Sequence, residues 1–196
     1  AGVVVYASPC EGGAQIALAH VARYIGKRAV IVCAKRRVRH PCTQAVAALG
    51  ADIVEVPGMA MLVVVQARAR ELAAREGWLL APFGLHVPGA IEAIAAAAHE
   101  TGLEPDEVWC AGGSGLLARG LAHAWPSARR HVVQVGHKLT PQDVAHATIH
   151  IAPQRFAQAL ACREFSSHGH YDAKAWRICQ REHGDGTVVF WNVFGS

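Results

Sequence analysis

The sequence is poor in charged and aromatic residues, and it lacks a long apolar run. Of its 196 residues, 17% are charged and 7% aromatic, whereas 52% are hydrophobic. That apolar content is too high for a disordered chain and is enough for a packed core. The longest apolar candidate, residues 59–66, falls short of the roughly 18 residues that a membrane-spanning helix needs. No basic stretch opens the chain, so we expect neither a signal peptide nor a membrane partner.

The sequence also lacks a CxxC pair, and its cysteines are widely spaced. They are Cys10, Cys33, Cys42, Cys110, Cys162 and Cys179. In a chain with its own core, such cysteines are typical of buried thiols in a reducing compartment. We therefore expect a cytoplasmic protein without a disulfide framework.

A strong excess of charge is missing as well. The formal net charge is +4, and residues 35–40 form the one marked basic run. This mild surplus favours small anionic ligands over nucleic acid. The twelve histidines show no consistent metal-ligand spacing, so no metal site is expected.

The chain does contain a regular alternation of apolar runs and helical patterns. Strands are predicted at residues 3–7, 29–33, 52–56, 78–81, 107–111, 131–136 and 187–193, and helices at 14–25, 41–49, 64–75, 89–100, 116–124 and 171–181. Repeated strand–helix units predict an α/β fold with mostly parallel sheet and helices on both faces. The stretch 57–60 suggests a boundary between a smaller lobe, residues 1–58, and a larger lobe, residues 59–196.

Two loops that join a predicted strand to a helix contain several glycines. In open α/β sheets, ligands bind beyond the carboxyl ends of the strands, where both loops are expected to lie. The first loop contains Cys10, Glu11, Gly12, Gly13 and Gln15. Its glycines allow a close backbone approach, and the following helix N-terminus favours an anion. A tight turn with an ordinary cap would explain the same residues.

The second loop suits a phosphate group more closely. It consists of Gly112, Gly113, Ser114, Gly115 and Leu116, and it offers successive N–H groups and a hydroxyl. The spacing also fits a relaxed dinucleotide fingerprint. However, the next predicted strand ends without the carboxylate that such a site needs for the ribose. A lone phosphate is therefore a better prediction than a nicotinamide cofactor.

A third loop, residues 166–174, collects hydroxyls, imidazoles, a phenol and a carboxylate before a helix. It includes Tyr171 and Asp172. An acidic residue in a first turn is favoured by the helix dipole, so Asp172 has a purely structural explanation as well.

The order of these loops resembles the fold-type-II pyridoxal-phosphate enzymes, the superfamily of the tryptophan synthase β subunit. The resembling stretches are ASPCEGGAQIALAHVARYIG (residues 7–26), TQAVAALGADIVEVPG (43–58) and VWCAGGSGLLARGLA (108–122). The stretch YDAKAWRICQREHGDGTVVFWNVFG (171–195) is similar to the end of the aminocyclopropane-carboxylate deaminase and D-cysteine desulfhydrase group.

This resemblance implies pyridoxal phosphate as cofactor and a homodimer that eliminates or deaminates a small amino acid or related amine. It implies that the second loop binds the cofactor phosphate and the first loop the substrate. It also implies that Asp172 holds the pyridine nitrogen, and that Tyr171 transfers a proton or stacks on the substrate.

The sequence departs from the family pattern at several positions. Glu11 would repel a substrate carboxylate, and Ala173 replaces the usual glycine. The family's Schiff-base lysine precedes the segment that corresponds to residues 3–7, and none of the four lysines here matches its motif. We expect that the N-terminal segment of the fold is missing. The alternative is a non-catalytic protein of the same fold that binds a phosphorylated ligand.

Overall fold

The chain consists of two compact units, Ala1–Leu85 and His86–Ser196. The computed structural model describes residues 2–58 and 60–193. This division falls later in the sequence than the expected boundary at residues 57–60, of which Met59 is not described. The reason is that residues 62–80 contribute a helix that packs on the first sheet and a strand that joins it. The last residues of the C-terminal stretch in the resemblance, 194 and 195, also lie outside the described residues. None of the described helices is long and apolar enough to cross a membrane.

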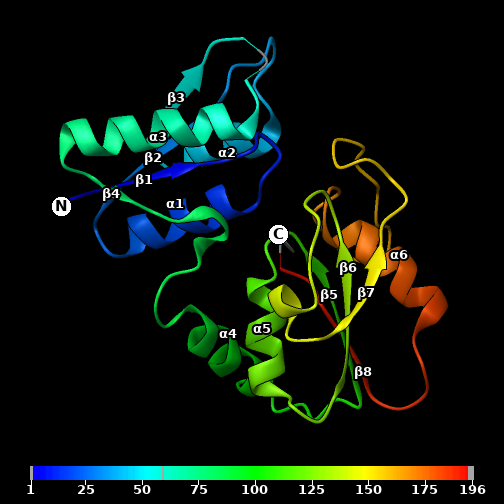
Figure 1. Ribbon diagram of the computed structural model, residues 1–196. Coiled ribbons are helices and arrows are strands. Elements are labelled where there is room, and N and C mark those ends of the chain that lie inside the picture. Colours follow the sequence, from blue (N-terminus) through cyan, green and yellow to red (C-terminus); the bar gives the residue numbers. More distant parts are fainter. Residues whose placement is uncertain (1, 59, 194–196) are drawn as a thin grey trace. The chain divides into compact units, whose positions relative to one another are not determined.

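The first unit is built on a four-stranded parallel sheet with the order β3-β2-β1-β4. Its elements are β1 (Val3–Ala7), α1 (Ala14–Tyr24), β2 (Arg28–Ala34), α2 (Pro41–Ala48), β3 (Asp52–Val56), α3 (Leu62–Glu76), β4 (Leu79–Leu80) and the 3-10 helix η1 (Phe83–Leu85). In the register, Val5 lies opposite Val30, and Ile31 lies opposite Ile53. Figure 1 shows α3 on one side of this sheet and α1 on the other.

Both faces of the first sheet are buried, which explains why its strands are almost continuously apolar. Successive side chains of a strand point to opposite faces. Val5 therefore packs with Val65 of α3, whereas Ile31 packs with Leu18 of α1 and Val46 of α2 on the other face.

The second unit repeats this plan with the strand order β7-β6-β5-β8, again all parallel. Its elements are α4 (Ala90–His99), β5 (Glu107–Gly112), α5 (Leu116–Ala124), β6 (Arg129–Gln134), the 3-10 helix η2 (Gln142–Val144), β7 (Thr148–Ile151), α6 (Asp172–Glu182) and β8 (Val188–Trp191). In Figure 1, α4 and α5 cover one side of the sheet and α6 the other. The α/β fold with parallel sheets and helices on both faces is thus confirmed.

Small residues bring α4 and α5 together. A Cβ atom on Gly120 of α5 would lie 2.4 Å from Ile94 of α4, so only glycine fits there. Ala98 and Leu121 fill the core below the two helices. On the opposite face of the sheet, Trp109 packs with Ile178 of α6.

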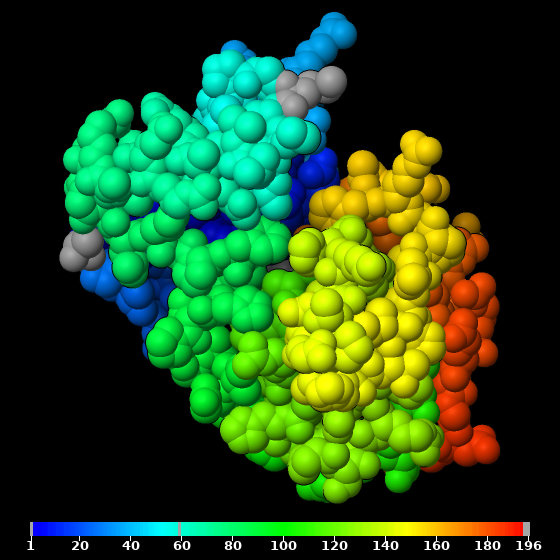
Figure 2. Space-filling model, viewed as in Figure 1, coloured from blue at the N-terminus to red at the C-terminus, as the bar shows by residue number. Residues whose placement is uncertain are grey.

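The segment between β7 and α6 lies on the surface of the second unit, drawn in yellow to orange in Figure 2. The buried Lys174 of α6 holds this segment in place. Its Nζ donates hydrogen bonds to the carbonyl oxygens of Arg155 at 2.9 Å and Phe156 at 3.1 Å. Burial lowers the pKa of Lys174. The Lys174 side chain therefore stabilises the conformation of the segment between β7 and α6.

A buried carboxylate fixes the amino-terminal edge of the second sheet. Glu107 is 2% exposed and accepts hydrogen bonds from Trp109 Nε1, from Arg129 Nη2 at 2.9 Å and from the Gly184 backbone N–H at 3.2 Å. Burial acts to raise the pKa of Glu107, but the hydrogen bonds from Trp109, Arg129 and Gly184 outweigh it and hold the pKa below its usual value. The ionised carboxylate is therefore the form that the fold stabilises.

Replacing Glu107 by Gln is expected to lower the free energy of unfolding by about 2 kcal/mol at pH 7, because charge-assisted hydrogen bonds become neutral ones. A depressed folded-state pKa stabilises the fold above the unfolded value of about 4.3, and this contribution disappears as the pH falls through the folded-state pKa. Urea unfolding at pH 7 and at lower pH measures both effects. The exposed Glu104→Gln is the control, and equal stability of the two variants would contradict the assignment.

Candidate functional site

Each of the two glycine-containing loops follows the strand at which the strand order of its sheet reverses. β1 lies between β2 and β4, and β5 lies between β6 and β8. Such a switch point leaves a crevice at the carboxyl ends of parallel strands, where ligands bind in open α/β folds. The topology therefore places a candidate loop at the switch point of each unit.

In the second unit, close contacts require glycine at several positions of the loop after β5. A Cβ atom on Gly112 would lie 2.4 Å from Val132 Cγ1, and one on Gly115 would lie 2.1 Å from the carbonyl oxygen of Asp143 in η2. Gly115 also has a φ of +84°, which side chains rarely adopt. Steric limits therefore determine the path of this loop.

The loop leads directly into the N-terminus of α5. The Arg119 backbone N–H donates to the Gly115 carbonyl oxygen at 3.1 Å and begins the helical hydrogen bonds. The first N–H groups of a helix have no acceptor within the helix, and the helix dipole is positive at this end. Ser114 is half-buried beside these groups. The loop has the donors and the electrostatic field that a phosphate group requires.

Tyr171 and Asp172, which lie far from this loop in sequence, lie next to it in the structure. Tyr171 Cε1 is 3.2 Å from the position that a Cβ atom on Gly113 would occupy. Asp172, the first residue of α6, is 1% exposed. Burial and the nearby charge of Asp172 together raise the pKa of Cys110, in β5, to about 12. The structure thus brings the phosphate-loop residues, the phenol and the carboxylate to one edge of one sheet.

Asn192 belongs to the same edge, and sequence analysis missed it. It directly follows Trp191, which lies opposite Cys110 in the β5–β8 register. Asn192 Nδ2 donates to the Ser166 carbonyl oxygen at 2.8 Å. Within the described residues, Asn192 Oδ1 and Ser167 Oγ are buried side-chain atoms without a hydrogen-bond partner. The sequence did contain a signal for Asn192, because it is a polar residue directly after an apolar strand.

In the first unit, hydrogen bonds hold the loop after β1 in shape. Gln15 is fully buried, and its Nε2 donates to the carbonyl oxygens of Cys10 at 2.9 Å and Pro9 at 3.2 Å. A Cβ atom on Gly12 would lie 2.7 Å from Ser8 Oγ, so glycine is needed there. Gly13 is the N-cap residue of α1. The predicted residues of this loop are thus grouped, but within the first unit.

Arg36 compensates the negative charge of Glu11. By itself, that charge would repel a substrate carboxylate. Arg36 Nη2 lies 3.5 Å from Glu11 Oε1. The two residues line a small cavity of about 110 Å³ together with Ser8, Cys10 and Leu62. Part of the basic run at residues 35–40 therefore contacts the candidate loop, and Arg36 is a residue that sequence analysis did not assign to it.

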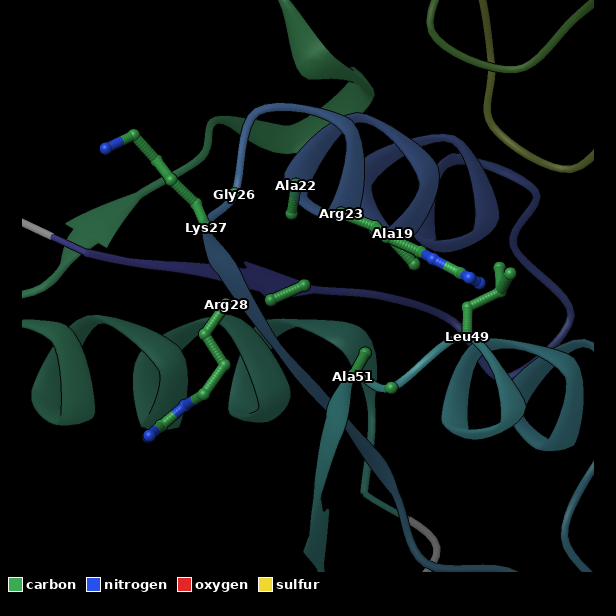
Figure 3. Close-up of a pocket in the computed structure, with 10 residues that line it drawn as sticks. Ala19, Ala22, Arg23, Gly26, Lys27, Arg28, Leu49 and Ala51 are labelled. Atoms are coloured by element: carbon green, nitrogen blue, oxygen red, sulfur yellow. The ribbon is translucent and has the colours of Figure 1, made fainter.

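A larger cavity, of about 360 Å³, opens at the other edge of the first sheet (Figure 3). Its lining includes Arg23, Lys27 and Arg28, at the end of α1 and the start of β2. Figure 3 shows the Lys27 and Arg28 side chains pointing away from it, and Arg28 pairs with Asp52 at 2.9 Å. It lies at the amino ends of the strands, opposite the edge that binds ligands in such sheets.

Replacing Gly115 by Ala is expected to lower the free energy of unfolding by about 3 kcal/mol, because positive φ and overlap with the Asp143 carbonyl act together. Thermal and urea unfolding measure the loss. Gly102→Ala is the matched control, since Gly102 also has a positive φ but a Cβ atom there meets nothing within 4 Å. A loss as small as that of Gly102→Ala would show that η2 does not press on this loop.

Comparison with known proteins identifies the family. Residues 1–190 match the model of the family described as "Pyridoxal-phosphate dependent enzyme". No curated protein matches the chain significantly. Within residues 2–58 and 60–193, no three His, Cys, Asp or Glu side chains are grouped to hold a metal ion.

Several solved structures share the fold. An ACC deaminase homologue is 16% identical with a TM-score of 0.75, and the match covers 97% of this chain and 72% of that one. Threonine deaminase isoform 2 from Solanum lycopersicum is 20% identical with a TM-score of 0.59, covering 97% of this chain and 52% of that one. Diaminopropionate ammonia lyase from Escherichia coli is 14% identical with a TM-score of 0.64, covering 98% and 65%.

The resemblance to fold-type-II enzymes is thereby confirmed, and with it pyridoxal phosphate as the family's cofactor. At these identities, the solved structures support the fold alone. The match over residues 1–190 shows that the chain belongs to the pyridoxal-phosphate dependent enzyme family.

Proposed function

We propose that this chain is part of a lyase or deaminase that uses pyridoxal phosphate on a small amino acid or related amine. One observation carries this proposal. A glycine loop suited to phosphate, a phenol and a buried carboxylate meet at the switch point of one parallel sheet. The glycine loop suits the cofactor phosphate, the carboxylate suits the ring nitrogen, and the phenol suits proton transfer at the reacting carbon of the substrate.

The residues present fit the cofactor. At Gly112 and Gly115 a Cβ atom would collide with neighbouring residues, so the backbone can approach a phosphate closely only because side chains are absent. The backbone N–H groups of residues 113–116 and the Ser114 hydroxyl would hold the phosphate oxygens. When bound, pyridoxal phosphate withdraws electrons from the substrate amine and weakens bonds at the adjacent carbon.

Asp172 and Tyr171 would act on the ring and the substrate. A buried carboxylate favours a proton on a nearby ring nitrogen, which strengthens the ring as an electron acceptor. The burial of Asp172 at the first turn of α6 supports this role. Tyr171 lies beside Gly113, where its hydroxyl would move a proton or its ring would stack on the substrate.

The loop after β1 would bind the substrate carboxylate through residues 10–15. Arg36 supplies the positive charge that Glu11 by itself would oppose. Gln15 Oε1 is buried and has no hydrogen-bond partner among the described residues, so it can accept one from the substrate amine. We also infer a homodimer in the cytoplasm, from the family resemblance and the free thiols.

A second candidate is a protein that binds a phosphorylated ligand without covalent chemistry. Lys174 favours it, because this buried lysine donates hydrogen bonds to two carbonyl oxygens and is not available to form a Schiff base. The binding loop would be the same, and only the reaction would be lost.

Ammonia release separates the two candidates. The full-length protein of which this chain is part is incubated with pyridoxal phosphate and, in turn, D- and L-cysteine, D- and L-serine and 1-aminocyclopropane-1-carboxylate. A lyase or deaminase releases ammonia from one of them only when cofactor is present, and Asp172→Asn reduces the release about 100-fold. Saturable cofactor binding without ammonia from any of them would instead support the second candidate.

A further inference from the structure

Two thiols meet beside the small cavity of the first unit. Cys10, in the loop after β1, is 3% exposed, and Cys33, near the end of β2, is 1% exposed. Both side chains belong to one core cluster, on the face of the first sheet that α3 covers. The Ser8 backbone N–H donates to the Val32 carbonyl oxygen at 2.9 Å and so holds the loop along β2. The fold thus brings the two thiols into one cluster although 23 positions separate them in the sequence.

Charges around this pair favour a thiolate at Cys10. Hydrogen bonding from Cys33 is the largest cause that lowers the pKa of Cys10, to about 6, and Arg36 lowers it further, against burial and Glu11. The Ala34 carbonyl oxygen, 3.1 Å from Cys10 Sγ, favours the thiol form. The same pair raises the pKa of Cys33. The lowered pKa favours the thiolate at Cys10, and the raised pKa of Cys33 keeps that thiol protonated.

The cavity gives a small reagent access to this sulfur. Its volume is about 110 Å³, and Cys10, Glu11 and Arg36 are among its lining residues. A water molecule occupies roughly 30 Å³ in the liquid, so hydrogen peroxide fits and a bulky disulfide such as oxidised glutathione does not. Arg36, paired with Glu11, offers a cation to a departing hydroxide.

We propose that Cys10 and Cys33 form a peroxide-sensitive dithiol, with Cys10 as the reacting thiolate and Cys33 as the resolving thiol. Cys10 lies in the loop that precedes α1 and Cys33 lies in β2, so a disulfide between them would lock that loop to β2. This inference does not rest on the proposed function, because it concerns only the chemistry of two thiols within the first unit.

Each step balances. The Cys10 thiolate attacks one peroxide oxygen, the O–O bond breaks, and hydroxide leaves and takes up a proton to become water. Cys10 is thereby oxidised by two electrons to a sulfenic acid, and the peroxide is reduced. Cys33 then loses its proton and attacks Cys10 Sγ. The S–S bond forms, the S–O bond breaks, and a second water leaves.

The other buried thiols provide internal controls. Burial raises the pKa of Cys110 and of Cys179, in each case to about 12, so both stay protonated near neutral pH. Protonated buried thiols react slowly with peroxide. Oxidation is therefore expected to select the Cys10–Cys33 pair over Cys110 and Cys179.

Peptide mapping after peroxide treatment tests the assignment. The native chain is treated with equimolar to tenfold hydrogen peroxide, alkylated and digested. The expected product is one disulfide between the Cys10 and Cys33 peptides, reversed by dithiothreitol. In Cys33→Ser, a dimedone adduct is expected at Cys10, and in Cys10→Ser, Cys33 stays reduced. A different pairing, or equal oxidation of Cys110, would overturn the proposal.

A second pair of variants avoids changes in the core. Arg36→Gln is expected to slow oxidation of Cys10 about tenfold at pH 6.5, because the thiolate fraction falls. Arg37→Gln removes the same charge from the next, exposed position and is expected to leave the rate unchanged. Equal rates in the two variants would show that Arg36 does not activate Cys10 and would contradict the proposed reacting thiolate.

Discussion

Replacing Ser114 by Asp is expected to raise the Kd for pyridoxal phosphate about 100-fold. The new carboxylate would face the dianionic phosphate at the N-terminus of α5. Two like charges about 4 Å apart at a protein surface repel by about 4 kcal/mol per pair. Ser114 is half-buried, so solvent screening leaves an effect of about 3 kcal/mol, or 100-fold. Titration of the cofactor, followed by quenching of tryptophan fluorescence, measures the change.

Two controls make this result specific. Ser114→Ala removes only the hydroxyl and keeps the backbone N–H groups, so its Kd is expected to rise no more than about tenfold. Ser127→Asp adds the same charge at an exposed turn before β6, at the opposite edge of the sheet, and is expected to bind like the wild type. If Ser114→Asp also bound like the wild type, the phosphate would have to lie elsewhere.

Replacing Asp172 by Asn is expected to reduce turnover about 100-fold while the Kd for the cofactor changes only a few-fold. The amide keeps the shape of the side chain but carries no negative charge to hold a proton on the ring nitrogen. A loss of about 2.7 kcal/mol of transition-state stabilisation corresponds to this factor. Initial rates of ammonia release by the full-length protein at saturating cofactor measure it.

The fold must be shown to survive this change, because Asp172 is buried at the start of α6. Far-ultraviolet circular dichroism and the urea midpoint check this, and Asp185→Asn, in an exposed turn, is the matched control. Unchanged turnover in a folded Asp172→Asn protein would remove the role of the carboxylate at the ring nitrogen.

Apolar periodicity predicted most of the helices and strands. The predicted bounds of β1, β3 and α5 agree with the structure to the residue, because each element has a continuous apolar pattern closed by glycine, proline or a polar turn. β7 is absent from the predicted strands. It is a short edge strand with the polar residues Thr148 and His150, and only its pairing with β6 defines it.

The division into units was harder to predict. Its sequence signal, a proline–glycine pair at residues 57 and 58, marks a turn within the first unit, because Val65 and Leu72 of α3 continue the core of the first sheet. Whether a helix closes one core or begins another depends on packing between distant segments, which periodicity does not encode.

The loops of the candidate site were predictable one by one, but the contacts between them were not. The glycines after β5 carried a local signal, since strand-to-helix loops with free N–H groups suit phosphate. The contact of Tyr171 with Gly113 joins residues 58 positions apart and follows from the β5–β8 pairing and the packing of α6. The pairing of Arg36 with Glu11 likewise depends on the loop lying along β2.

The most direct test of the central claim compares three ligands that differ in one group. Pyridoxal phosphate, pyridoxine 5′-phosphate and pyridoxal are titrated against the chain under the same conditions. If residues 112–116 hold the cofactor through its phosphate, both phosphorylated ligands bind saturably, compete with inorganic phosphate and lose affinity in Ser114→Asp, whereas pyridoxal binds at least 100-fold more weakly. Equal affinity for pyridoxal and pyridoxal phosphate would contradict the phosphate-binding loop.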